Sequence, residues 1–289
     1  MVGDAVSSLS FIKMHGAGND YVFVDGFSHP LPQDAPGLAI AVSHRHFGIG
    51  ADGLVLLSPP ADDASDVEMR MWNADGSEGA LCGNAARCVA LWMNVNGRLA
   101  GPCRIKMVSR VVTVETLEID AQRQAGRFCV DHGPPQIDAV GQVNLESLSA
   151  VAAAVDLPQW PLKCVSLSMG NPHAVFVVDE ITDQLVRGLG PAIEKSLQFV
   201  GGTNVEWVRA INRQRLEVRV WERGSGETLA CGSGACAAVV ACVQQGFCDR
   251  NVDVLVELPG GRLSVRWSES GSVFLTGPAE VSFTGVWGG

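Results

Sequence analysis

Cys82-Gly83-Asn84-Ala85-Ala86-Arg87-Cys88 decides the fold, because the later stretch Cys231-Gly232-Ser233-Gly234-Ala235-Cys236 repeats its design. Each stretch follows a loop rich in Gly, Ser and Asp and opens a run of small residues, a pattern that predicts the start of a helix. A helix start presents N–H groups and partial positive charge, which favour an anion such as a ligand carboxylate or a thiolate. A cysteine there is expected to have a lowered pKa and to exchange protons near neutral pH.

An internal repeat surrounds the two Cys-Gly stretches. In each half, a Gly-Asn turn leads into an apolar strand that ends in Asp, and a Trp stands 10 residues before the Cys. Asn19 and Asp52 are 33 residues apart, as are Asn171 and Asn204. We therefore predict two half-chains of one ancestral plan, residues 1–129, completed by 275–289, and residues 130–274. The linker between them is predicted at 131–135, and the active site in the cleft between the halves.

The coarse secondary structure favours an α+β fold. Short β-rich runs dominate and are bounded by Gly, Pro, Asn or Asp, namely 21–25, 53–57, 111–115, 174–178, 216–221, 252–258 and 272–275. Helical patterns are fewer and cover 36–46, 84–94, 145–155, 182–197 and 234–245. Because strands outnumber βαβ units, a mixed or antiparallel sheet is expected in place of a doubly wound one.

Composition excludes several classes of function. The chain has 289 residues, 47% of them hydrophobic, and a net charge of −10, which argues against nucleic acid as its main partner. We expect no membrane span and no signal peptide, and so a cytoplasmic protein. The nine cysteines include no C-x-x-C pair, so no zinc site or other metal site is predicted. Most of these cysteines are expected to be small core residues, among them Cys88, Cys236 and Cys242.

Two matched thiols suggest one kind of chemistry. Pseudo-equivalent halves would bring Cys82 and Cys231 to opposite sides of a bound amino acid, whose carboxylate would sit on the helix starts. One thiolate could then remove the α-proton while the other thiol returns a proton to the opposite face. A Cys–His hydrolase with His173 leaves Cys82 without a role, while a redox-sensing thiol pair stays open.

The combined motifs closely resemble the diaminopimelate epimerase family. The resemblance covers nearly the whole chain and rests on 14–20, 73–78, 82–84, 169–173, 222–224, 226–228 and 231–234. It implies two similar α+β domains, each with mostly antiparallel, barrel-like strands around a central helix. It also implies an isomerase that needs no PLP or other cofactor, interconverts LL- and meso-2,6-diaminopimelate for lysine and peptidoglycan synthesis, and forms a homodimer.

The resemblance also assigns roles to residues. Cys82 and Cys231 would be the acid/base pair, and His173 and Glu222 would tune their pKa values. The substrate would be held by Asn19, Asn73, Gly83, Asn84, Asn171, Asn204, Glu222, Arg223, Gly232 and Ser233. Two alternatives remain at this point, a cofactor-independent racemase of another amino acid and a thiol-redox sensor or binding protein.

Overall fold

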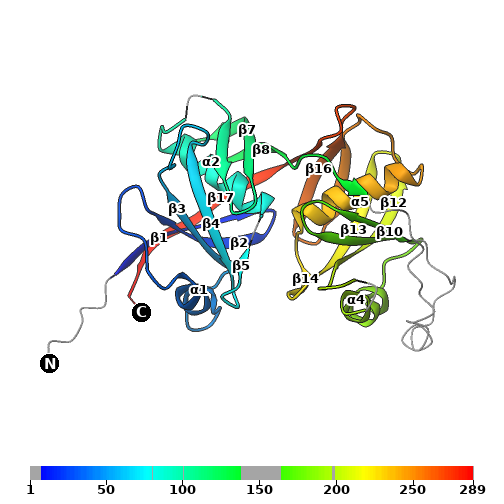
Figure 1. Ribbon diagram of the computed structural model, residues 1–289, viewed down its shortest axis with the longest axis horizontal. Helices are drawn as coiled ribbons and strands as arrows, with labels where there is room; N and C mark the ends of the chain where they lie inside the picture. Colours follow the sequence, from blue (N-terminus) through cyan, green and yellow to red (C-terminus); the bar gives the residue numbers. More distant parts are fainter. Residues whose placement is uncertain (1–7, 80, 100, 138–163, 197–198, 289) are drawn as a thin grey trace. The chain divides into compact units, whose positions relative to one another are not determined.

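The computed structural model describes residues 8–79, 81–99, 101–137, 164–196 and 199–288. Contacts between Cα atoms divide the chain into two compact units, Met1–Val130 with Gly277–Gly289, and Asp131–Thr276. The helix expected at 145–155 lies outside the described residues. Each unit is an α+β fold with a closed sheet, which confirms the predicted fold class (Figure 1).

The first unit is a barrel of eight strands. In order around the barrel these are the C-terminal part of β17 (Val273–Trp287), β1 (Leu9–Gly16), β2 (Asn19–Asp25), β3 (Gly53–Ser58), β4 (Val67–Asn73), β6 (Cys103–Lys106), β7 (Val111–Asp120) and β8 (Ala125–Asp131). Strand β8 pairs with β17 and closes the sheet, which therefore has no long open edge. A short strand, β5 (Glu78–Gly79), is added beside β4.

The second unit repeats this order. After β9 (Gln136–Ile137) come β10 (Cys164–Ser168), β11 (Pro172–Val177), β12 (Asn204–Asn212), β13 (Arg215–Glu222), β15 (Val254–Leu258), β16 (Gly261–Trp267) and the start of β17, with β14 (Gly226–Thr228) beside β13. Backbone hydrogen bonds from His132 to Val273 and from Val273 to Gly133 complete the ring. Parallel pairing of β11 with β12 matches that of β2 with β3, so the sequence repeat is also a repeat of topology.

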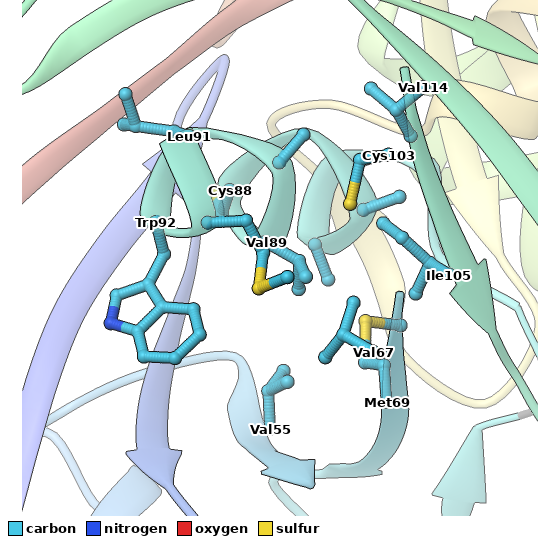
Figure 2. Packing of buried hydrophobic residues seen from close by; sticks show 14 of the residues in the cluster. Val55, Val67, Met69, Cys88, Val89, Leu91, Trp92, Cys103, Ile105 and Val114 are labelled. Carbon is cyan, nitrogen blue, oxygen red and sulfur yellow. The ribbon is translucent and has the colours of Figure 1, made fainter. Parts of the chain in front are cut away.

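A helix that begins with small residues occupies the centre of each barrel. Helix α2 (Gly83–Val95) contacts β1, β6 and β7, and α5 (Gly232–Gln244) contacts β10, β11, β12, β13, β15 and β16. Figure 2 shows Cys88 and Val89 of α2 pointing toward Val55 and Ile105 on the surrounding strands. Almost every side chain of both helices is buried, and Ala, Gly and Cys allow the strands to approach on all sides.

Among the described residues, further helical segments pack on the outside of the strands. Helix α1 (Ala35–Ser43) contacts β2, β3 and β4, and its first turn is capped by Asp34, which accepts from Gly37 N at 2.9 Å. The predicted end at residue 46 is wrong, because Ile49 N and Gly50 N bond to Val42 O and turn the chain away.

The helix predicted at 182–197 is also corrected by the structure. It consists of a π-helix, η2 (Gln184–Leu189), followed by the short α4 (Gly190–Glu194). Pro191 has no N–H to donate, so a continuous α-helical ladder across this point would lack a bond. No helix among the described residues is long and apolar enough to cross a membrane.

Candidate active site

Cys82 is the N-cap residue of the central helix in the first unit. Its backbone is extended, with φ −145° and ψ 110°, and its sulfur accepts from Ala85 N at 3.4 Å. The sulfur also lies 3.6 Å from the hydroxyl of Tyr21 and 3.8 Å from Asn19 Oδ1. The strand that carries Asn19 and Tyr21 therefore brings two polar groups to a partly exposed thiol.

The Asn19 amide is fixed in one orientation beside this thiol. Its Nδ2 donates to Asp52 Oδ2 at 2.7 Å, and its Oδ1 accepts from Asn84 Nδ2 at 3.0 Å. Asn84 is held in turn by the buried Arg87, whose guanidinium donates to Asn84 Oδ1 at 2.8 Å. Asn19 thus presents an acceptor to Cys82, since its donor faces Asp52.

Asp52 belongs to a cluster of charged residues. Arg45 donates to Asp52 Oδ1 and Asp20 Oδ1, each at 2.8 Å, while the buried Lys13 donates to Asp20. Although burial opposes it, hydrogen bonds from Arg45 and Lys13 hold the pKa of Asp20 below its ordinary value. Burial and the charge of Asp20 raise the pKa of Asp52.

Cys231 has the equivalent position in the second unit. It is the N-cap residue of α5, with φ −110° and ψ 112°, and its sulfur accepts from Gly234 N at 3.3 Å. The hydroxyl of Ser233 lies 3.6 Å from the sulfur and accepts from Asn171 Nδ2 at 3.2 Å. Cys231 is buried, whereas Cys82 is half-buried.

A buried His–Glu pair stands behind Asn171. His173 Nε2 lies 3.0 Å from Asn171 Oδ1, and His173 Nδ1 lies 2.7 Å from Glu206 Oε1. Neither His173 nor Glu206 has any exposed surface. His173 therefore reaches the Cys231 site through Asn171, and Glu206 supports it from strand β12.

The other predicted residues of the second unit gather at the ends of β12 and β13. Glu222 accepts from the hydroxyl of Thr228 and also interacts with Cys231. Asn204 is buried, donates to Pro172 O at 3.0 Å and accepts from the backbone N–H of Arg223 at 2.9 Å. The exposed guanidinium of Arg223 donates to Gly201 O at 3.3 Å, so it can turn toward an anion at small cost.

Asn73 is the last residue of β4 in the first unit, and its side chain faces the turn that follows. Its Nδ2 donates to Ser77 Oγ at 3.0 Å, and the turn contains Gly76 at φ 84°. Gly83 and Gly232 are the first residues of α2 and α5, directly after the two cysteines. Asn19, to which Asn84 is bonded, lies beside Cys82, and Ser233 and Glu222 lie beside Cys231, with Asn171 bonded to Ser233. Asn73, Asn204 and Arg223 instead contact neighbouring turns and backbone.

The expectation of a lowered thiol pKa is wrong for Cys231. Burial raises the pKa of this thiol well above its ordinary value, and the charges of Glu222 and Glu206 raise it further. Hydrogen bonds from Ser233 and Gly234 act in the opposite direction but are smaller effects. The helix start alone does not ionise a thiol that has been taken out of water.

Sequence reasoning missed two side chains that complete the sites. Tyr21 could have been found, because it holds the same place after Asn19 that His173 holds after Asn171. Glu206 could not be found in this way. It follows Asn204 by two residues, but the residue at the equivalent position of the first half, two after Asp52, is the apolar Leu54. Alternation along β12 was the available signal, since it places Asn204 and Glu206 on one face.

Cys88 provides a control for the chemical role of Cys82, because it lies six residues further along, in the same helix. It has no exposed surface, and burial raises its pKa to about 12. Cys88→Ala is expected to leave catalytic activity within about twofold and to lower the free energy of unfolding by roughly 1 kcal/mol, the cost of a small cavity. Activity assays and urea unfolding would measure both quantities. A large loss of activity without unfolding would contradict its assignment to the core.

No group of three or more His, Cys, Asp or Glu residues that could hold a metal ion occurs in the described part of the chain. What the sites do contain is two helix starts with a sulfur at each N-cap, amide groups, and carboxyls of raised pKa. Such groups can bind carboxylate and ammonium groups and can exchange protons.

Known proteins match this chain over nearly its full length. The family model described as diaminopimelate epimerase matches residues 11–137 and 165–282. The chain is 42% identical to a diaminopimelate epimerase from Geobacillus thermodenitrificans (strain NG80-2), over 97% of each chain. It is 40% identical to that of Bacillus subtilis (strain 168), over 98% of this chain and 99% of the relative.

Solved structures share the fold at lower identity. A predicted epimerase from Pseudomonas aeruginosa superimposes with a TM-score of 0.73 at 18% identity, over 96% of this chain and 99% of that one. A hydroxyproline epimerase from Agrobacterium vitis superimposes with a TM-score of 0.68 at 14% identity, over 99% and 93%. These similarities support the two-unit fold.

Proposed function

The chain belongs to the diaminopimelate epimerase family and is a PLP-independent isomerase that interconverts LL- and meso-2,6-diaminopimelate; we propose that Cys82 and Cys231 are its two acid/base residues. The observation that carries this proposal is that each sulfur is the cap of a central helix and accepts an N–H of its first turn. The two cysteines thus share a structural position that the other described cysteines do not have.

In the proposed reaction one sulfur begins as a thiolate and the other as a thiol. The thiolate takes the α-proton from one face, so a C–H bond breaks and an S–H bond forms. The second thiol gives its proton to the opposite face of the same carbon, and its own S–H bond breaks. No net oxidation occurs, and the two sulfurs have exchanged protonation states at the end of a turnover.

The substrate carries two carboxylates and two ammonium groups, and the sites offer partners for each kind. We propose that the reacting carboxylate binds at the helix starts, on Gly83, Asn84, Gly232 and Ser233. Arg223 would clamp the distal carboxylate, Glu222 would accept an ammonium group, and Asn19, Asn73, Asn171 and Asn204 would complete the contacts.

Glu222 is proposed to link substrate binding to the state of Cys231. Burial raises the pKa of Glu222, and its charge in turn raises the pKa of the Cys231 thiol. A substrate ammonium group beside Glu222 would offset that negative charge and favour the thiolate. His173 would tune the same thiol through Asn171 and Ser233.

We further propose that the protein is a cytoplasmic homodimer that binds neither nucleic acid nor membranes and needs no cofactor. The net charge of −10 supports the first of these exclusions, since a nucleic-acid surface needs a basic patch.

Turnover in heavy water tests the proposed function directly. With LL-diaminopimelate in D₂O, each meso product molecule is expected to carry deuterium at the inverted α-carbon, because the returning proton comes from a thiol that exchanges with solvent. Mass spectrometry and chiral chromatography would measure isotope content and configuration together. Proline, glutamate and lysine serve as comparison substrates and are expected to remain unlabelled.

Two results would contradict the proposal. Racemisation of a single-centre amino acid without turnover of diaminopimelate would indicate a sister racemase. Binding or oxidation of thiols with no deuterium incorporated into any amino acid would indicate a redox sensor. Neither alternative is favoured by relatives that share about 40% identity over the whole chain.

A further inference from the structure

A continuous chain of hydrogen bonds joins Glu206 to Cys231 inside the second unit. From Glu206 Oε1 it passes to His173 at 2.7 Å, to Asn171 at 3.0 Å and to Ser233 at 3.2 Å, and it ends 3.6 Å away at the sulfur. Glu206 contributes nothing else to the reaction as proposed above. Its full burial on β12 therefore needs another explanation.

The orientation of Asn171 sets the direction of this chain. Its Nδ2 donates to Ser233 Oγ, so the hydroxyl hydrogen of Ser233 can turn to the sulfur of Cys231. Its Oδ1 faces His173 Nε2, and because an amide oxygen only accepts, Nε2 must carry a hydrogen. All donors in the chain then point toward Cys231.

The same geometry fixes the number of protons on the His–Glu pair. With a hydrogen on Nε2, a neutral His173 offers only a lone pair at Nδ1, which an ionised Glu206 would repel. One proton must therefore lie between Nδ1 and Glu206 Oε1, on either atom, and the pair carries no net charge. Burial, which raises the pKa of Glu206, is consistent with this extra proton.

In the first unit the equivalent amide, that of Asn19, has the opposite orientation. There Asp52 accepts from Asn19 Nδ2, so Asn19 turns its oxygen toward Cys82. Asn171 is turned the other way because His173 occupies its oxygen. The residue that faces the amide thus decides whether the nearby sulfur meets an acceptor or, through Ser233, a donor.

We propose that Glu206 is a positioning residue for Cys231, onto whose sulfur it directs the Ser233 hydroxyl through His173 and Asn171. Without a partner at Nδ1, His173 could move its hydrogen from Nε2 to Nδ1, and Asn171 would then flip and draw the Ser233 hydrogen away from the sulfur. This inference rests on the proposed acid/base role of Cys231. It adds Glu206, which acts through other residues and contacts neither the proton on the sulfur nor the substrate.

Other titratable groups also face this site. Glu222 on β13 lies beside Cys231, and Cys164 on β10 lies near Glu206. If Glu206 acted on Cys231 only by negative charge, it would oppose the thiolate as Glu222 does. The hydrogen-bond chain predicts that Glu206 favours the thiolate. Removing Glu206 should therefore move the pH midpoint of Cys231 alkylation up if the chain dominates and down if charge repulsion dominates.

The test is the pH dependence of alkylation by iodoacetamide in the full-length protein. Tryptic peptide 71–87 contains Cys82 alone, whereas peptide 224–250 contains Cys231 together with Cys236, Cys242 and Cys248. Fragment-ion mass spectrometry, which locates the alkylated sulfur within a peptide, can therefore follow both sites in one sample. Glu206→Leu is expected to slow alkylation of Cys231 about tenfold near neutral pH and to move its midpoint to higher pH. Cys82 is expected to be unchanged.

Glu206→Gln is the matched control, because a Gln amide can donate to Nδ1 and keep the hydrogen on Nε2. It is expected to restore the wild-type midpoint. Ser233→Ala breaks the last link and is expected to shift the midpoint as Glu206→Leu does, with no added effect in the double variant. If Glu206→Leu does not fold, faster alkylation in Glu206→Gln or an unchanged midpoint in Ser233→Ala still overturns the proposal.

Faster alkylation of Cys231 in both Glu206 variants would overturn the proposal in favour of simple charge repulsion. An unchanged Cys231 midpoint in Glu206→Leu or in Ser233→Ala, or equal changes at Cys82 and Cys231, would overturn it as well. Alkylation needs no substrate, so this result is separate from the proposed function. If Cys231→Ser epimerised normally, the acid/base role would fail while the chain of hydrogen bonds could still be confirmed.

Discussion

Cys82→Ser and Cys231→Ser are each expected to lose about 10²- to 10⁴-fold in kcat for epimerisation, the usual contribution of a general acid or base. A serine hydroxyl keeps its proton near neutral pH, so it cannot act as the base, and as an acid it is too weak. The size of the side chain changes little, and the oxygen can still cap the helix as the sulfur does. The loss should therefore be chemical and should leave folding nearly unchanged.

Chiral analysis of the product, together with a thermal unfolding curve for each variant, would measure this effect. Cys88→Ala is the matched control, because it removes a sulfur from the same helix in a place where the thiol is buried and its pKa is about 12. Activity within tenfold of wild type in either serine variant would contradict the two-thiol reaction.

The repeat in the sequence predicted two similar halves, while the strands around a central helix were implied by the family resemblance. The equal spacing from Asn19 to Asp52 and from Asn171 to Asn204 corresponds to equivalent strand pairs, β2 with β3 and β11 with β12. Each predicted helix start next to Cys-Gly is the N-terminus of a central helix. The small residues that follow each Cys-Gly indicate a buried helix, because a helix inside a barrel must be buried on every side.

Strands with charged residues were harder to predict. Strand β1 contains Lys13, which is buried, and local patterning gives no reason to place a lysine inside. Its partner Asp20 is on β2, and the two meet only after the strands pair. Glu206 is a similar case, because its burial depends on His173 from another strand. Long-range pairs of this kind have no local signal in one sequence.

The thiol environment also depends on the folded structure. The motif predicts a helix start, which favours an anion, but the depth of Cys231 in the barrel is set by strands far along the chain. Burial therefore outweighs the helix start in the resting protein. Substrate charge and the hydrogen bond from Ser233 are the means by which the thiolate becomes accessible under the proposed scheme.

Gly234→Ala is expected to lower kcat by about 10²-fold, the scale of a small misplacement in an active site. Alanine favours a helix over glycine, so local propensity alone predicts a gain in stability. A Cβ at this position, however, would lie 2.9 Å from Glu206 Oε1 and 3.2 Å from Cys231 Sγ. Since Glu206 is fully buried and bonded to His173, either the carboxyl or the sulfur must move.

The overpacking should cost about 1–3 kcal/mol in the free energy of unfolding. Gly101→Ala is the control, because its Cβ would meet nothing within 4 Å. Adding Glu206→Asp to Gly234→Ala shortens the carboxyl and should recover stability, but activity should stay low because the shorter side chain no longer reaches His173. Urea unfolding and kcat measured on the same preparations separate the two effects. Near-normal activity of Gly234→Ala would mean that Gly234, Glu206 and Cys231 are packed less tightly than the structure has them, and the positioning role of Glu206 would lose its geometric basis.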